Sequence, residues 1–218
     1  MRPVGTVVAL GAAPALAAAR LHATALDCEV LGPDFRRIKQ SQAGSLLFAL
    51  VEDGTDPALA AAVKALRILR KRGGGEALVV LPALEALPGP QARALLQRAA
   101  ELARACVVQP LAPASWQDAV RCLVEPLTVF GLAGVDAREI HALVAKPRVA
   151  LLHTSIAQVP RESRDLLVSC RLRPNACLRD LEEAARAAAE AAPRAKLVLA
   201  APEVGDARGP RTLAASFL

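Results

Sequence analysis

Five short apolar runs in the first half of the chain alternate with segments of helical length, and this alternation restricts the possible folds more than any other feature. The runs are TVVAL, CEVLG, SLLFALV, EALVVLP and ACVVQP. Each is a predicted buried strand, because it is mainly apolar and ends at Gly, Pro or an acidic residue. Strands that alternate with helices form parallel sheets covered on both faces. The sequence therefore predicts an α/β fold with a Rossmann-like parallel sheet over residues 1–112.

The second half has a different rhythm, which begins after the apolar segment ASWQDAVRCLVEPLTV. That segment is predicted to be a helix whose last turns are bent or shortened by Pro126. Beyond it, RVALLHTS, DLLVSCRL, AKLVLAAPEV and PRTLAASFL are four predicted strands, with the amphipathic segment LRDLEEAARAAAEAA between the second and third. We expect a central linking helix at residues 113–133 and an α+β domain with a four-stranded sheet at residues 134–218. Helices are expected at about residues 14–24, 57–72, 90–104, 114–129 and 178–192.

Composition argues against a nucleic-acid partner. The chain is 54% hydrophobic but only 2% aromatic, so its core consists mainly of Ala, Leu and Val, and few rings remain to stack on bases. The net charge of +6 gathers partly in RRIK, from Arg36 to Lys39, and in RILRKR, from Arg67 to Arg72. The second cluster lies at a predicted helix C-terminus, where the helix dipole favours cations. We therefore expect solvated helix ends there rather than a phosphate-binding strip.

The cysteines and histidines indicate no metal site. The five cysteines form no C-x-x-C pair, and the three histidines are far apart in the sequence. Scattered cysteines in apolar settings are typical of buried thiols in a reducing cytoplasm. No apolar run approaches the ~18 residues needed to span a bilayer. We therefore expect a cytoplasmic protein without a membrane span.

The first residues, MRPVGTVVALGAAPALAAAR, allow two interpretations. An arginine followed by an apolar stretch and small residues is typical of a signal peptide. A strand, a turn and a helix are favoured instead, because TVVAL stops at Gly11 and Pro14 fits the first turn of a helix.

An acidic pair, Asp136 and Glu139 in GLAGVDAREIHAL, stands at a predicted helix start. Residues three apart share one helix face, so both carboxylates can meet one target. The pair also fits a capping box, in which each side chain accepts a hydrogen bond from a free backbone N–H. The local sequence favours the cap, and the two roles are compatible.

The order of the elements resembles the tubulin/FtsZ superfamily, in which a nucleotide-binding α/β domain precedes a central helix, an acidic loop and a smaller four-stranded domain. The run LRDLEEAARAAAEAAPRAKLVLAAPEVGDARGPRTLAASFL resembles the end of an FtsZ core, including its acidic turn. RVALLHTSIA is similar to the strand after the FtsZ acidic helix, and PDFRRIKQSQA to the segment after its second strand. GTVVALGAAPALAAAR takes the place of the first phosphate loop, of which only Gly11 is kept.

The resemblance gives the acidic pair a role between subunits. In that family the acidic loop and helix of one subunit enter the nucleotide pocket of the next, and two acids polarise the water that attacks GTP. The resemblance places Asp136 and Glu139 at those positions. In a protein without nucleotide they become interface residues, and Arg36, Arg37 and Lys39 are candidate basic partners across a head-to-tail contact.

The phosphate loops depart from the family pattern. The FtsZ loop of the form GGGTGTG follows the strand that is EALVVLP here, yet this chain continues ALEALPGPQARA. Glycines let successive backbone N–H groups approach a phosphate, whereas Leu84 and Pro88 obstruct that approach and Glu85 repels it. In the first loop Pro14 supplies no N–H.

These departures predict an FtsZ-like structural or regulatory protein, a pseudo-GTPase of the bacterial cell-division cytoskeleton that needs no cofactor. It would form filaments with itself or bind an FtsZ-type partner. The alternative is a GTPase with atypical loops, which uses GTP and Mg²⁺ and hydrolyses GTP at subunit interfaces with Asp136 and Glu139 as catalytic acids. An enzyme acting on a small molecule is disfavoured, because no Ser/His/Asp or Cys/His arrangement is evident.

Overall fold

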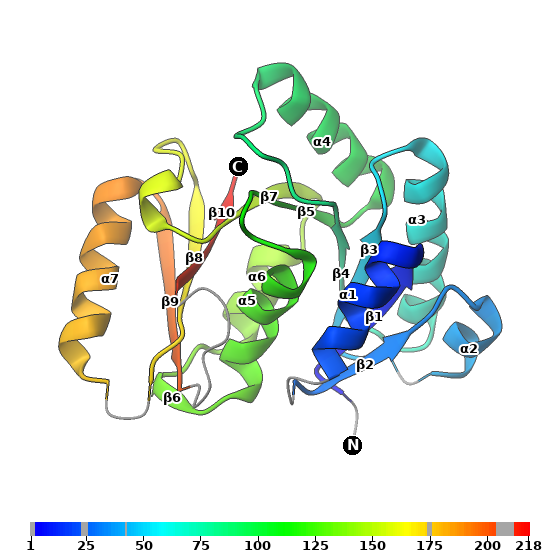
Figure 1. Cartoon of the computed structure of the whole chain (residues 1–218), viewed down its shortest axis with the longest axis horizontal. Coiled ribbons are helices and arrows are strands. Elements are labelled where there is room, and N and C mark those ends of the chain that lie inside the picture. Colours follow the sequence, from blue (N-terminus) through cyan, green and yellow to red (C-terminus); the bar gives the residue numbers. More distant parts are fainter. Residues whose placement is uncertain (1–2, 23–25, 42, 174–175, 204–211) are drawn as a thin grey trace.

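One mixed sheet of ten strands crosses the molecule in the computed structural model, which describes residues 3–22, 26–41, 43–173, 176–203 and 212–218 (Figure 1). From edge to edge the strand order is β2-β1-β3-β4-β5-β7-β10-β8-β9-β6. The strands are β1 (Gly5–Leu10), β2 (Cys28–Leu31), β3 (Leu46–Val51), β4 (Glu76–Val80), β5 (Cys106–Pro110), β6 (Gly131–Ala133), β7 (Arg148–His153), β8 (Asp165–Cys170), β9 (Lys196–Pro202) and β10 (Thr212–Phe217). The helices are α1 (Ala12–His22), α2 (Phe35–Gln40), α3 (Asp56–Lys71), α4 (Pro90–Ala103), α5 (Trp116–Thr128), α6 (Ala137–Val144) and α7 (Leu178–Ala191), with a 3-10 turn η1 (Ile156–Gln158).

The first five strands are parallel, as the sequence predicts, and the α/β class is confirmed. β1 lies between β2 and β3, which is the flavodoxin-like strand order. In the Rossmann order the first strand lies between the second and the fourth. The strand order of this half therefore differs from the Rossmann arrangement that the sequence suggested.

Different helices cover the two faces of the sheet, because alternate side chains of a strand point to opposite faces. Val7 and Phe48 pack on one face with side chains of α1, α5 and α6. Val8 and Ala49 pack on the other face with side chains of α2, α3 and α4. The helices after β1 and β3 thus leave the sheet towards opposite faces.

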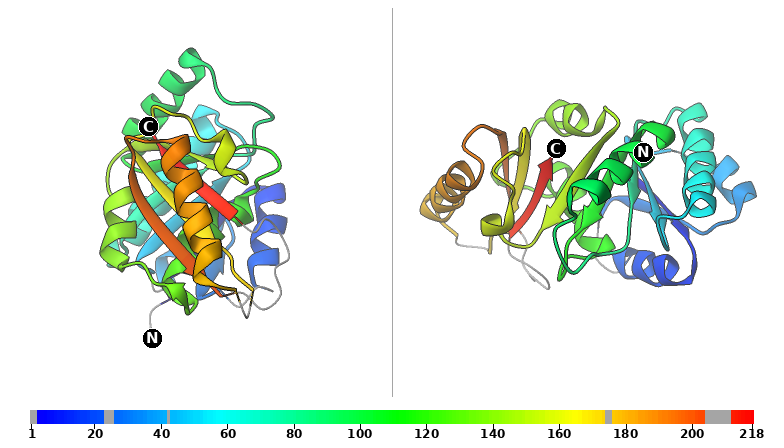
Figure 2. Two further views of the ribbon diagram at one scale, coloured as in Figure 1. Left: turned by 90° about the vertical axis from the view of Figure 1, so that its left-hand side faces the viewer. Right: turned by 90° about the horizontal axis from the view of Figure 1, so that it is seen from above.

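The four strands predicted for the second half are present, but they continue the first sheet. β7 pairs in parallel with β5, with Cys106 opposite Arg148. β10 lies antiparallel between β7 and β8, β9 runs parallel to β8, and β6 closes the edge antiparallel to β9. Figure 2 shows α7 packed over the outer strands of this half. Hydrogen bonds of the sheet therefore cross the boundary expected between the two halves.

Helix α5 packs against strands of both halves of the sheet. Its Leu123 is 2% exposed and lies in one core cluster with Leu46 of β3 and Phe217 of β10. Nε of the buried Arg171, just after β8, donates a hydrogen bond to Oε2 of the buried Glu125 of α5 at 2.9 Å. Breaking such a buried pair by removing one partner leaves an uncompensated charge, so the pair links α5 to the second half.

Several local details differ from expectation. FRRIKQ forms the short helix α2, which was not predicted; Asp34 caps it and Ile38 is buried. The strand β6 was also missed. Pro126 lies inside α5 only two residues before its end at Thr128, so it shortens the helix little. The predicted helix end at residue 24 and the acidic turn at residues 204–211 lie outside the described residues.

Candidate functional site

The switch point of the parallel sheet lies between β1 and β3, where α1 and α3 leave to opposite faces. Ligands of open α/β sheets bind at such a point, beyond the carboxyl ends of the strands. Gly11 follows β1 here with φ 127°, and a Cβ on it would lie 2.6 Å from Oε2 of Glu52. Glu52 directly follows β3. Its carboxylate therefore lies beside the start of α1, in the kind of position where a helix N-terminus holds a phosphate.

The rest of the β3 loop is organised by its own side chains. Asp53 accepts hydrogen bonds from the backbone N–H of Thr55 at 3.0 Å and from its hydroxyl at 2.6 Å. These bonds stabilise the carboxylate and lower the pKa of Asp53. The loop presents two carboxylates to solvent at the switch point, an arrangement that repels an anionic ligand.

The first part of the loop after β4 is hydrogen-bonded to β5 and to the residues that follow β5. The N–H of Leu81 donates to the carbonyl of Val108, and that of Leu84 to the carbonyl of Pro110, both at 3.0 Å. The carbonyl of Leu84 accepts from Ala112 at 2.8 Å. Glu85 is exposed. This segment, which takes the place of the glycine-rich loop in the resemblance, therefore extends the sheet, and these N–H groups are not turned towards a phosphate.

The acidic pair lies at the start of α6. Asp136 is the N-cap residue, and its Oδ1 accepts a hydrogen bond from the N–H of Arg138 at 2.8 Å. Glu139 lies in the first turn, and both acids are exposed. The predicted cap by Asp136 is confirmed. A return bond from Glu139 to the cap backbone is not formed within the described residues, so Glu139 is left to face solvent.

The predicted basic partners lie on α2. Arg36, Arg37 and Lys39 are all exposed, while α2 packs against α3. The acidic pair belongs to α6, which packs on the opposite face of the sheet. One chain therefore does not bring the two sets of charges together, and a contact between them requires two molecules.

The structure brings together a histidine and a serine that no sequence motif connects. Nε2 of His153 on β7 lies 3.0 Å from Oγ of Ser216 on β10, and both residues are fully buried. Burial lowers the pKa of His153 to about 4, so the imidazole is neutral at pH 7. Nδ1 has no hydrogen-bond partner among the described residues. A pair without a carboxylate on the histidine and without access to solvent is not arranged for nucleophilic catalysis.

The five cysteines are free thiols. Cys106, Cys122 and Cys170 are buried, as expected, and burial raises the pKa of Cys106 to about 12. Cys177 contradicts the expectation, because it lies exposed at the N-cap of α7. Its position before a polar helix start, rather than within an apolar strand, explains the difference.

Neither a metal site nor a known relative indicates a function. No cluster of three or more potential metal ligands occurs among the residues that the structure describes. No helix of the described ranges is long and apolar enough to cross a membrane. Comparison with protein-family models gives no match, and comparison with curated proteins gives none either.

Proposed function

We propose that the chain is a structural or regulatory protein that acts by binding other protein chains and turns over no nucleotide. The observation that carries this proposal is the switch point, where the carboxylate of Glu52 lies beside Gly11 at the start of α1. The β4 loop supports it, because phosphate binding needs several N–H groups directed at the ligand, whereas those of Leu81 and Leu84 are bonded to Val108 and Pro110.

The resemblance to FtsZ gives the proposal a specific form. The chain is a divergent pseudo-GTPase that assembles head to tail with itself or with an FtsZ-type partner. Asp136 and Glu139 on α6 meet Arg36, Arg37 and Lys39 on α2 of the next molecule. A contact between two different surfaces propagates into open filaments unless its rotation closes a ring. The exposure of both sets of charges in one chain supports this arrangement.

Nucleotide binding tests the first part of the proposal. We expect isothermal titration calorimetry with GTP or GDP and Mg²⁺ to give a Kd no tighter than about millimolar, equivalent to about −4 kcal/mol. A micromolar Kd would instead favour the alternative, a GTPase with atypical loops. In that case the Asp136→Asn, Glu139→Gln variant should lose GTP hydrolysis as well.

The same variant separates capping from association in the absence of nucleotide. Asn caps a helix about as well as Asp, so Asp136→Asn with Glu139→Gln removes both charges and keeps the cap. We expect an unchanged thermal melt and a smaller sedimentation coefficient at concentrations where the natural protein associates. The matched control is Glu182→Gln with Glu190→Gln on the exposed face of α7, which should sediment as the natural protein does. Unchanged sedimentation of the α6 variant would show that the pair only caps its helix.

A further inference from the structure

Three neighbouring hollows lie along α3 and α4, with volumes of about 800, 710 and 300 Å³. The first two share Arg67 and Leu102, and the first and third share Leu59 and Ala99. Because they adjoin at these side chains, they are together called the α3–α4 groove. From Leu59 to Lys71 it follows α3 for about 18 Å at 1.5 Å per residue, the length of a three-turn helix.

Leucines of α4 are exposed along this groove. Leu95 and Leu102 are each 68% exposed and stand seven residues apart, so they lie on one stripe of the helix. Leu102 lines the two larger hollows, and Leu95 lines the smallest. The half-buried Leu59 and Val63 of α3 line the groove from its other side. An apolar stripe bordering a hollow is a surface that gains free energy when another apolar side chain fills it.

The charged side chains around the groove are mostly basic. The two larger hollows are lined by one acid, Asp56, and by six bases: Lys39, Lys64, Arg67, Arg70, Lys71 and Arg104. None of these bases forms an ion pair within the described part of the chain. Lys64 lies over the ring of Phe35 at 4.5 Å, which holds its ammonium at the edge of the groove. The excess of positive charge over a hollow attracts an acidic ligand.

We propose that the α3–α4 groove binds an acidic amphipathic helix of a partner protein. The apolar side chains of the partner helix lie in the groove, with Leu95 and Leu102 of α4 on one side and Leu59 and Val63 of α3 on the other. Its carboxylates pair with Arg67 and Lys71. An amphipathic helix that binds in an apolar groove presents its own anchor residues three, four and seven positions apart, so they would follow the apolar side chains along α3 and α4. The inference does not depend on the absence of nucleotide binding.

The shape and lining of the groove favour a helix over other anionic partners. A nucleic acid would find positive charge, but the lining of the three hollows contains no aromatic side chain on which bases could stack. An anionic membrane surface is broad and cannot follow a hollow between two helices, so it would leave Leu59 and Val63 uncovered. A helix with a protruding apolar ridge and flanking carboxylates complements both the apolar side chains that line the groove and the basic residues around it.

The test uses a fluorescein-labelled peptide of about 18 residues, long enough to be partly helical, with Leu at helical spacing and Glu at the other positions. A second peptide carries Lys in place of every Glu. We expect fluorescence anisotropy to show binding of the Glu peptide, weakening as salt rises, and no binding of the Lys peptide. The double variant Arg67→Glu, Lys71→Glu should bind the Glu peptide at least about tenfold more weakly and should now bind the Lys peptide.

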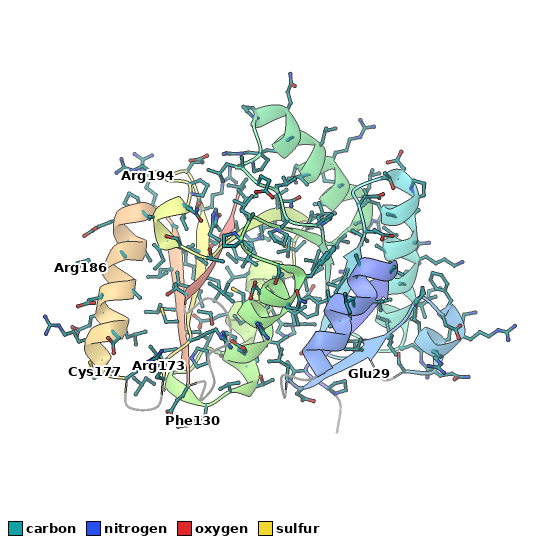
Figure 3. The ribbon with its side chains drawn as sticks, in the orientation of Figure 1. Glu29, Phe130, Arg173, Cys177, Arg186 and Arg194 are labelled. Atoms are coloured by element: carbon teal, nitrogen blue, oxygen red, sulfur yellow. The ribbon has the colours of Figure 1, made fainter. Side chains whose placement is uncertain are left out.

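Two controls separate the groove from general effects. Arg173→Glu with Arg186→Glu changes the net charge by the same amount on exposed residues of the second half, which Figure 3 places far from α3 and α4. This control should bind the Glu peptide as the natural protein does. Leu102→Ser should weaken binding at high salt as well as at low salt, because it removes an apolar contact. Circular dichroism should show natural helix content for every variant, since all the altered side chains are exposed.

Five outcomes would overturn the inference. The first three are failure to bind the Glu peptide, a binding loss in the control variant equal to that of Arg67→Glu, Lys71→Glu, and unchanged binding by Leu102→Ser. The fourth is that the groove residues bind phosphatidylserine vesicles or duplex DNA more strongly than the Glu peptide. A fifth is self-association that Arg67→Glu, Lys71→Glu disperses without any peptide, which would make a second copy the occupant. Loss of peptide binding alone would leave the sedimentation result for α6 standing, so the two proposals fail separately.

Discussion

The conformation and the hydrogen bonding of several single residues in this protein depend on contacts with residues far away in the sequence. Gly11 adopts a positive φ beside the carboxylate of Glu52, and any side chain at Gly11 would meet it. His153 and Ser216 are hydrogen-bonded inside the sheet although 63 positions separate them. Burial of the His153 and Ser216 side chains is costly unless they find hydrogen-bond partners, so the fold must bring the two together.

The buried histidine should make stability depend on pH. Its pKa is about 4 in the folded protein against 6.5 ordinarily, so between these values the unfolded chain binds more protons. Stability contributed by the neutral ring is present above pH 6.5 and is lost as pH falls towards 4, at no more than about 1.4 kcal/mol per pH unit. Urea unfolding of the natural protein and of His153→Gln from pH 4 to 7 checks this. The difference in the free energy of unfolding between the two proteins should change between pH 4 and 6.5, because all other groups titrate alike in both. Parallel curves would show that His153 does not cause the pH dependence.

Secondary-structure elements are positioned here by a few buried polar contacts as well as by apolar packing. α5 carries Glu125, whose pKa is raised by burial even though Arg171 and Arg121 oppose the shift. Arg148 of β7 pairs with Asp165 of β8 at 2.6 Å and lies 4.4 Å from the ring centre of Phe217 on β10. These contacts tie the strands and the central helix of the second half into one arrangement.

Breaking the pair between Glu125 and Arg171 should lower the free energy of unfolding far more than breaking a surface pair. We expect Glu125→Gln to lower the free energy of unfolding by about 3 kcal/mol or more, because it removes a carboxylate from a buried guanidinium. The matched control, Glu183→Gln, disturbs the exposed pair with Arg179 on α7 at 3.6 Å and should cost at most about 0.5 kcal/mol. Urea denaturation measures both. Equal costs would mean that the buried pair does not hold α5 in place.

At the scale of the whole molecule, the continuous sheet should make the two halves unfold together. β7 connects the parallel strands of the first half to β10, β8 and β9, and α5 packs on both halves through one core cluster. If the two halves were separate domains joined by a linker, only a few contacts would be lost when one half unfolded alone. Here, hydrogen bonds between β5 and β7 and the packing of α5 would both be lost.

A core substitution in α5 tests this cooperativity. Leu123→Ala should cost about 2–5 kcal/mol, as buried leucines do, and should lower the stability of both halves equally. Hydrogen exchange measured by mass spectrometry at increasing urea can follow peptides from β3 and β4 separately from those of β8 and β10. The exposed Leu95→Ala is the control and should change stability by no more than about 0.5 kcal/mol. Separate unfolding midpoints for the two halves would contradict a single cooperative unit.

The sequence alone located most of the helices and strands, because the signals that specify them are local. Apolar runs bounded by Gly, Pro or acidic residues gave the buried strands, and the helix expected at residues 57–72 is α3, which ends at Lys71 shortly before Gly73 with its φ of 84°. The cap at Asp136 was predictable for the same reason, since a capping side chain bonds a backbone group two or three positions away. The short helix α2 and the three-residue strand β6 were missed because so few residues carry little periodicity.

Only the tertiary structure decided which distant segments lie together. Local sequence does not encode the free-energy balance between alternative strand pairings. This balance places β1 between β2 and β3 and pairs β7 with β5. The contact of Glu52 with Gly11, the pair of His153 and Ser216, and the α3–α4 groove all follow from those pairings. The sequence by itself determined the elements, whereas the sites were determined by the fold, because side chains meet only after long-range strand pairing has fixed where each element lies.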